Sequence, residues 1–173
     1  SSVQDDPKAF EVMTAALEDP YFGLRIMAIE NIDLTQEKGK KALKLIEAIA
    51  TNDKETLVRA QAINKLFDYN SDAYIPLYKE ALQSNSSAIR GNALKALYWT
   101  DEEAALAYAG SLRDKMEKES IKDALIPVYI MSENENEIAF VADNVVEGMY
   151  DPSDRDRMNI YREGFQWIKD SNN

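Results

Sequence analysis

The chain has 173 residues, and 45% of them are hydrophobic, which is enough for one domain with a continuous core. The net charge is −11, which argues against DNA or RNA as a partner because phosphate binding depends on basic side chains. Cys and His are both absent, which excludes disulfides and cysteine or histidine metal sites, and no run of 18 apolar residues predicts a membrane span.

The chain begins at Ser1 without an initiator Met, so we expect a fragment of a longer protein. Residues 1–7 are expected to form a flexible segment ahead of one folded domain at 8–170. The compartment stays undetermined, because a fragment need not carry the signal peptide of its parent.

A motif that recurs four times organises the folded part. Each copy has apolar residues at offsets 0, 4, 5 and 8 from its first residue and a cation at offset 1, and this spacing predicts one apolar stripe on a helix. A second apolar stripe precedes each copy and predicts a partner helix. Before the first copy, this stripe consists of Phe10, Met13 and Leu17. The copies begin at Leu24, Val58, Ile89 and Ile121.

A helix pair that returns about every 30 residues is typical of an α-solenoid, because one pair cannot bury both of its apolar faces alone. The sequence therefore predicts an all-α fold, an α-α superhelix of about five antiparallel helix pairs. Pro127 is expected to kink or break a helix of the fourth pair. The pairs are expected at residues 8–34, 36–69, 71–100 and 101–132, followed by a closing pair at 133–170.

The cation at offset 1 allows two interpretations. In the first, the four cations form a ladder that binds an anionic partner. In the second, which we favour, each cation is structural and pairs with an Asp or a carbonyl of its own or a neighbouring repeat. Asp53 lies six residues before Arg59, as Asp19 lies six before Arg25, and this spacing favours the structural role. The repeat cations are Arg25, Arg59, Arg90 and Lys122.

No residue pattern in the sequence predicts catalysis. Zinc peptidase motifs and Ser-His or Cys-His pairs all need His, and the six Gly are scattered, so there is no Gly-rich phosphate loop. Carboxylates remain, but the cluster of Glu133, Glu135 and Glu137 is interpreted as a solvated loop and helix start. We therefore expect no catalytic residue, no metal ligand and no cofactor in this protein.

Three segments carry a further resemblance, EDPYFGLR at 18–25, LVRAQAI at 57–63 and AIRGNAL at 88–94. Their pattern resembles HEAT-type repeats, and residues 8–170 are similar to the C-terminal helical domain of aminopeptidase N-type zinc aminopeptidases, most of all to bacterial, Bacteroidetes-like versions. The catalytic residues of that family, HExxH and a distant Glu, lie in a preceding domain, so no catalytic residue is carried over to this sequence.

The resemblance implies a non-catalytic accessory domain that walls the peptide-binding cavity of a zinc aminopeptidase and controls substrate access. Its partners would be the catalytic domain of the same polypeptide and the peptide substrate, and zinc would be bound only in that catalytic domain. The alternative is a stand-alone HEAT-repeat scaffold that binds another protein.

Offsets 3 and 6 of each copy point away from the apolar stripe and are expected on the concave face formed by the second helices. This ridge is polar and rich in amides, which suits hydrogen bonding to a peptide backbone or a wet contact between domains. Trp99 lies at its edge, although a Trp at a repeat end is more often packed against the next helix. Lys65 is expected on an exposed face. The candidate contacts are Met27, Glu30, Gln61, Asn64, Asn92, Lys95 and Trp99.

Overall fold

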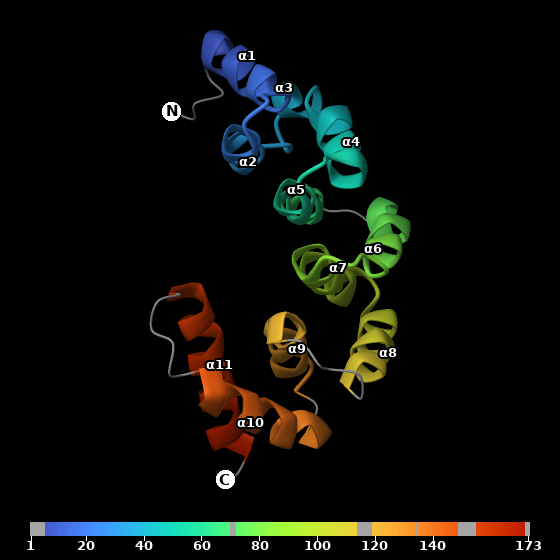
Figure 1. Cartoon of the computed structure of the whole chain (residues 1–173), viewed down its shortest axis with the longest axis vertical. Coiled ribbons are helices and arrows are strands. Elements are labelled where there is room, and N and C mark those ends of the chain that lie inside the picture. The colour runs from blue at the N-terminus through green and yellow to red at the C-terminus, as the bar shows by residue number, and fades with distance from the viewer. Residues whose placement is uncertain (1–5, 70–71, 114–118, 134, 149–154, 172–173) are drawn as a thin grey trace. The chain divides into compact units, whose positions relative to one another are not determined.

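The computed structural model describes residues 6–69, 72–113, 119–133, 135–148 and 155–171, and within these ranges every regular element is a helix. The predicted fold class, an all-α helical-repeat solenoid, is confirmed (Figure 1). The chain divides into two compact units, Ser1–Thr100 and Asp101–Asn173, called here the first and second unit. The extent of one folded domain at 8–170 stays a prediction.

The first unit consists of three helix pairs arranged in two rows. The first helices α1, α4 and α6 lie in one row, and the second helices α2, α5 and α7 lie in the other (Figure 1). Helix α5 packs directly against both α2 and α7. The bounds are α1 Pro7–Ala16, α2 Phe22–Asn31, α3 Glu37–Lys40, α4 Leu43–Asn52, α5 Thr56–Asp68, a 3-10 turn η2 Asp72–Tyr74, α6 Ile75–Ala81 and α7 Ser87–Thr100.

Local capping chemistry explains where several helices begin. Asp6 precedes α1, and its carboxylate accepts a hydrogen bond from the Lys8 N–H at 2.9 Å, while Pro7 occupies the first helical position without loss of a bond. Asp101 accepts from the Ala104 N–H at 3.2 Å, at the start of the next unit's first helix. These contacts satisfy backbone donors that a helix start otherwise leaves unpaired.

The repeated apolar stripe forms the core of the first unit. Offsets 4, 5 and 8 are buried in all three copies that lie in this unit, and offset 0 is buried at Val58 and Ile89. Leu24, at offset 0 of the first copy, is the exception and is 37% exposed. Burying these side chains stabilises the stack because each removes apolar surface from water, at roughly 1.5–3 kcal/mol per large side chain. The buried stripe residues are Ala28, Ile29, Ile32, Val58, Ala62, Ile63, Leu66, Ile89, Ala93, Leu94 and Leu97.

The second unit continues the helical pattern, and its helix α9 packs against α10 and α11. Of the two outcomes expected at Pro127, the break is wrong, because α9 runs through this residue without interruption, and the kink stays a prediction. Proline removes one helical hydrogen bond, but the neighbouring Leu125, Ile126 and Val128 are buried, and this packing holds the helix together. The bounds are α8 Glu102–Arg113, α9 Glu119–Ser132, a 3-10 turn η3 Glu135–Glu137, α10 Ile138–Gly148 and α11 Arg155–Ser171.

The acidic cluster before α10 differs in part from the expected solvated loop. Glu133 is exposed and has a positive φ of 49°, as a residue in a tight turn, but Glu137 is buried at 8% exposure. Within the described residues, no group of three or more acidic side chains is placed to hold a metal ion. In the same ranges, no helix combines the length and the hydrophobicity that crossing a membrane requires.

Candidate binding surface

A buried ion pair fixes the second helix of the first repeat to the second repeat. Arg25 on α2 donates from Nε and Nη2 to the two carboxylate oxygens of Asp53, each at 2.8 Å. Its Nη1 donates to the backbone oxygens of Asp19 at 2.7 Å and Pro20 at 3.2 Å. The two paired side chains are 6% and 8% exposed. Planar, two-point pairing of this kind fixes orientation as well as distance, so α5 is held in one register beside α2.

Arg59, the equivalent cation of the second repeat, has no carboxylate partner among the described residues. The six-residue spacing from Asp53 to Arg59 does not correspond to an ion pair, because Asp53 is held by Arg25 of the preceding repeat. The Arg59 Nε donates instead to the backbone oxygen of Ala50, at a long 3.4 Å. Arg59 is therefore held much less firmly than Arg25.

Arg90, in the third repeat, reproduces only the carbonyl part of the Arg25 arrangement. Its Nη1 donates to the backbone oxygen of Ser84 at 2.9 Å, six residues earlier, as Arg25 donates to Asp19. The side chain of Lys122 lies outside the described residues. The geometry at Arg25 and Arg90 supports a structural role for the repeat cations, and that role stays a prediction until the residues are changed.

The seven candidate contacts lie on α2, α5 and α7, and their exposure differs along the row. Met27 and Trp99 are large hydrophobic side chains that are 49% and 60% exposed. Trp99 makes an edge-on contact with Tyr98 of its own helix, with ring centroids 5.7 Å apart, and most of its surface is open rather than packed. Glu30 and Lys95 are exposed, and Gln61, Asn64 and Asn92 are half-buried.

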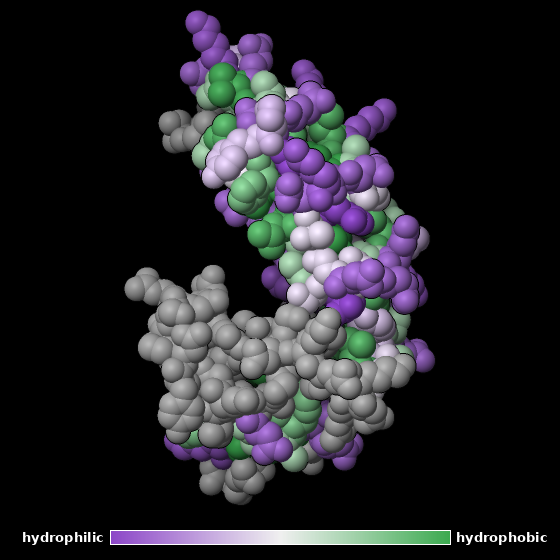
Figure 2. Space-filling model, in the orientation of Figure 1, coloured by the Kyte–Doolittle hydropathy of each residue, from purple (hydrophilic) through white to green (hydrophobic). Residues whose placement is uncertain are grey.

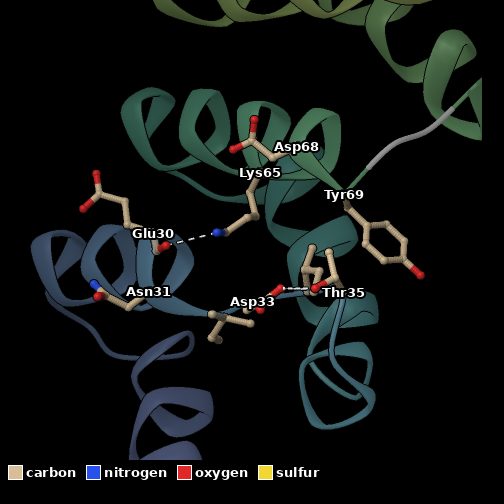
Figure 3. A pocket seen from close by; sticks show the side chains of 9 residues that line it. Glu30, Asn31, Asp33, Thr35, Lys65, Asp68 and Tyr69 are labelled. Carbon is tan, nitrogen blue, oxygen red and sulfur yellow. Dashed lines mark hydrogen bonds between the residues drawn. The ribbon is translucent and has the colours of Figure 1, made fainter. Parts of the chain in front are cut away.

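Two lysine contacts tie neighbouring helices of this row together. Lys65 on α5 donates to the backbone oxygen of Glu30 at the end of α2, at 3.0 Å (Figure 3). Lys65 is therefore half-buried and bonded, which is less exposed than the sequence predicted. The Nζ of Lys95 on α7 lies 5.9 Å from the ring centroid of Phe67 on α5, which is within cation–π range. These contacts connect α2, α5 and α7 into one continuous surface.

Helix α5 presents the most open hydrogen-bonding groups of the row. Gln61 and Asn64 lie one turn apart on the same side of the helix, and neither side chain has a hydrogen-bond partner within the described residues. Asn92 on α7 differs, because it donates to the backbone oxygen of Ala88 in its own helix at 3.0 Å. A half-buried amide without a partner offers two donors and an acceptor to an incoming ligand.

Leu57 belongs to the same surface and was missed by the sequence reasoning. It lies four residues before Gln61, on the same side of α5, and is 56% exposed. The repeat motif could have identified Leu57, because it stands at offset −1, which is one helical turn before offset 3 and therefore on the same face. Hydrophobic and hydrophilic side chains are interspersed over the visible face of the first unit (Figure 2). Leu57 and Trp99 therefore add apolar anchors to a surface that is otherwise mostly polar.

A shallow pocket of about 160 Å³ lies where the C-terminal ends of α2 and α5 meet (Figure 3). Asp33 lines it, and the Thr35 hydroxyl and then the Thr35 N–H hold the pKa of the Asp33 carboxyl below its usual range by hydrogen bonding to the charged form. Lys65 crosses the pocket to reach α2. Figure 3 draws two contacts in this pocket, Lys65 with Glu30 and Asp33 with Thr35, and the second of them stabilises the loop after α2.

Residues 42–126 match the family of HEAT repeats. The matched segment begins just before α4 and ends within α9, so it contains α5 and α7 together with the cations Arg59 and Arg90. The comparison with curated proteins gives no match. The family match supports a helical-repeat scaffold, an architecture that offers extended surfaces formed by successive repeats.

Proposed function

We propose that this protein is a helical-repeat scaffold that binds a segment of another polypeptide along the row formed by α2, α5 and α7. The proposal rests on the half-buried amides of Gln61 and Asn64, which have no hydrogen-bond partner among the described residues and lie beside the exposed Leu57 on α5. Amide side chains match the N–H and C=O groups of an extended peptide, which needs both donors and acceptors.

The charges along this row favour a polypeptide over a polyanion. Glu30 and Lys95 carry opposite charges, and the row has no cluster of basic side chains that could follow a phosphate backbone. Exposed aromatic side chains such as Trp99 are frequent anchors in protein interfaces. A mixed surface with a few apolar anchors is also typical of contacts that form and separate.

Packing supports this row as the inner side of the first unit. The second helices pack closely against one another, α2 with α5 and α5 with α7, whereas the first helices of adjacent pairs share few close contacts. In a solenoid, the row whose helices lie closer together is the concave one, because the stack bends toward it. A concave row can surround an extended ligand from successive repeats.

We further propose that this protein is an accessory domain of a zinc aminopeptidase, and that the polypeptide bound along the row is the peptide substrate of that enzyme. The support is the resemblance of residues 8–170 to the C-terminal helical domain of that family. The domain would wall the peptide-binding cavity, and the row would meet the peptide substrate, while zinc and the reacting groups would lie in the catalytic domain. A stand-alone scaffold for a separate protein is the alternative.

Selection of random 12-residue peptides displayed on phage tests the binding surface. Peptides selected on the wild-type protein should bind the double variant Gln61→Ala/Asn64→Ala at least about tenfold more weakly, the loss expected for one to two hydrogen bonds. The matched control Asn136→Ala/Gln166→Ala removes two exposed amides as well, but in the second unit, and should bind as the wild type. Equal losses in both variants would contradict the proposal.

The full-length protein that contains this sequence distinguishes the accessory domain of an aminopeptidase from the stand-alone scaffold. If the reading frame ahead of Ser1 encodes HExxH and a downstream Glu, the parent with Gln61, Asn64 and Asn92 changed to Ala should show an altered KM or length preference for peptides. A single-residue chromogenic substrate should respond little, because it does not reach this wall. A reading frame that encodes neither HExxH nor the downstream Glu would contradict the aminopeptidase proposal and favour the stand-alone scaffold.

A further inference from the structure

The loops inside the three helix pairs of the first unit share one construction. In each loop, the side chain six residues before the repeat cation accepts a hydrogen bond from the backbone N–H two residues later. This side chain is a carboxylate in the first two repeats and a hydroxyl in the third. Asp19, Asp53 and Ser84 accept from the N–H groups of Tyr21, Glu55 and Ser86 at 2.7, 2.8 and 3.1 Å, respectively.

The repeat cation of one pair meets the loop of the next pair. Arg25 of the first repeat donates two hydrogen bonds to the carboxylate of Asp53 in the loop of the second repeat. In the same register, Arg59 of the second repeat faces the loop of the third, where the equivalent residue is Ser84. Serine has no carboxylate, and its side chain is shorter than that of aspartate. No side chain equivalent to Asp53 therefore pairs with the cation in the second interface.

A pocket occupies this position in the second interface. It has a volume of about 290 Å³, and both Arg59 and Ser84 line it, together with Thr51 at the end of α4 and Ala81 at the end of α6. Beyond the 3.4 Å contact of its Nε with Ala50, no hydrogen bond engages the Arg59 guanidinium within the described part of the protein. Its terminal nitrogens are free to take a ligand.

We infer that the Arg59 pocket binds one carboxylate of a partner protein, held by Arg59 as Arg25 holds Asp53. The inference takes from the proposed function only that the partner is a protein. The recognised group is the side-chain carboxylate of an Asp or Glu, or the terminal carboxylate of a polypeptide, since both present the same planar pair of oxygens that an arginine fork matches. The pocket lies at the loops that join paired helices, away from Gln61 and Asn64, so it forms a second contact point on the scaffold.

Glu80 is the residue of this protein that could compete for the site. It lies on α6, lines the same pocket and is exposed, and the structure shows no ion pair between it and Arg59 among the described residues. A partner's carboxylate must enter beside this negative charge, so the affinity of the pocket for a single carboxylate should be weak. The affinity should be lower still in rotamers that bring the Glu80 carboxylate close to Arg59.

Titration with sodium acetate, replacing sodium chloride at constant ionic strength, tests the site on the intact protein. The NMR signal of the Arg59 Nε–H group and the backbone amide signal of Ser84 should shift and saturate. The Arg25 Nε–H signal should stay unchanged, because its carboxylate place is filled. In Arg59→Gln, the Ser84 shift should be lost.

A second variant keeps the test decisive if Arg59→Gln is poorly folded. Ser84→Asp places a carboxylate where the second repeat has Asp53, so it should abolish the acetate response and raise Tm. The rise in Tm should disappear when Ser84→Asp is combined with Arg59→Gln, which separates the ion pair from any effect of the new charge on the start of α7.

Two peptides distinguish the sources of the carboxylate. N-acetyl-Ala-Asp-Ala-amide has only a side-chain carboxylate, and N-acetyl-Ala-Ala-Ala with a free C-terminus has only a terminal one, so the tighter binder identifies the source. A linear, unsaturable response of Arg59 to acetate would overturn the inference. So would a saturable response that appears only in Glu80→Gln, because Glu80 would then fill the site in the natural protein.

Discussion

Replacing Asp53 by Ala removes the carboxylate that the buried Arg25 guanidinium holds at 2.8 Å through two nitrogens. The variant leaves a cation that is only 6% exposed without its counter-charge. Leaving one member of a buried pair uncompensated costs about 3–5 kcal/mol. The lower end applies here, about 3 kcal/mol, because Arg25 keeps its bonds to the backbone oxygens of Asp19 and Pro20.

The assay is urea unfolding followed by far-UV circular dichroism, with a thermal scan beside it. A loss of about 3 kcal/mol in the free energy of unfolding corresponds to roughly 6–12 °C in Tm for a protein of this length. The matched control is Asp19→Ala, which removes the same kind of loop bond, to the Tyr21 N–H, without an ion pair. It should cost about 0.5–1.5 kcal/mol.

A double-mutant cycle with Arg25→Met isolates the interaction itself. The coupling free energy between Arg25 and Asp53 should exceed about 1.5 kcal/mol, as for charge-assisted bonds removed from water. Arg59→Ala should cost less than Arg25→Ala, since Arg59 makes one long bond to the part of the chain that the structure describes. If Asp53→Ala and Asp19→Ala cost the same, the ion pair does not hold the repeats together and the reasoning fails.

Gly39→Ala should destabilise the protein by about 2 kcal/mol or more, because a Cβ there would lie 1.8 Å from the backbone oxygen of Asp33. The control Gly110→Ala meets no atom within 4 Å and lies inside α8, so it should stabilise by about 0.5–1 kcal/mol; urea unfolding gives both values, and two losses of equal size would refute the packing argument. The Thr35 hydroxyl is the main cause of the lowered Asp33 pKa, so Thr35→Ala should raise that pKa toward its usual range. Because the folded-state pKa is the lower one, the Asp33 contribution to stability is present above the unfolded-state pKa and is lost as pH falls through the folded-state pKa; NMR titration of the carboxyl carbon measures it, and an unchanged pKa would show that Thr35 is not the cause. Trp99→Phe should remove most of the iodide-quenchable fluorescence, since Trp99 is 60% exposed, and quenching that stays as in the wild type would mean that Trp99 is covered in solution.

The fold could be predicted because its determinants are local and repeated. One helix's apolar stripe at offsets 0, 4, 5 and 8 shows which face is buried, and three copies of it are buried as the spacing requires, with Leu24 as the exception. The structure of α9 could not be predicted in this way. Pro127 weakens the helix locally, but the burial of its neighbours overrides that preference, and burial depends on other helices.

Contacts between repeats explain most of what the sequence reasoning missed at the candidate site. The spacing from Asp53 to Arg59 is visible in the sequence, whereas the pairing of Asp53 with Arg25 depends on how two repeats stack. Lys65 likewise reaches a backbone oxygen 35 residues away, at Glu30, and no local pattern encodes that distance. The candidate row on α2, α5 and α7 could be proposed from offsets alone, because it requires only the face opposite the core.

Photo-crosslinking from the candidate row tests the binding surface most directly. A benzophenone amino acid is placed at position 64 on α5, or at the exposed position 44 on α4 as the control, and the protein is irradiated in extract of its own source cells. The account predicts one discrete polypeptide product at position 64, identified by mass spectrometry, that is absent at position 44 and is suppressed by a peptide selected on the wild-type protein. The same products at both positions, or none at position 64, would contradict it.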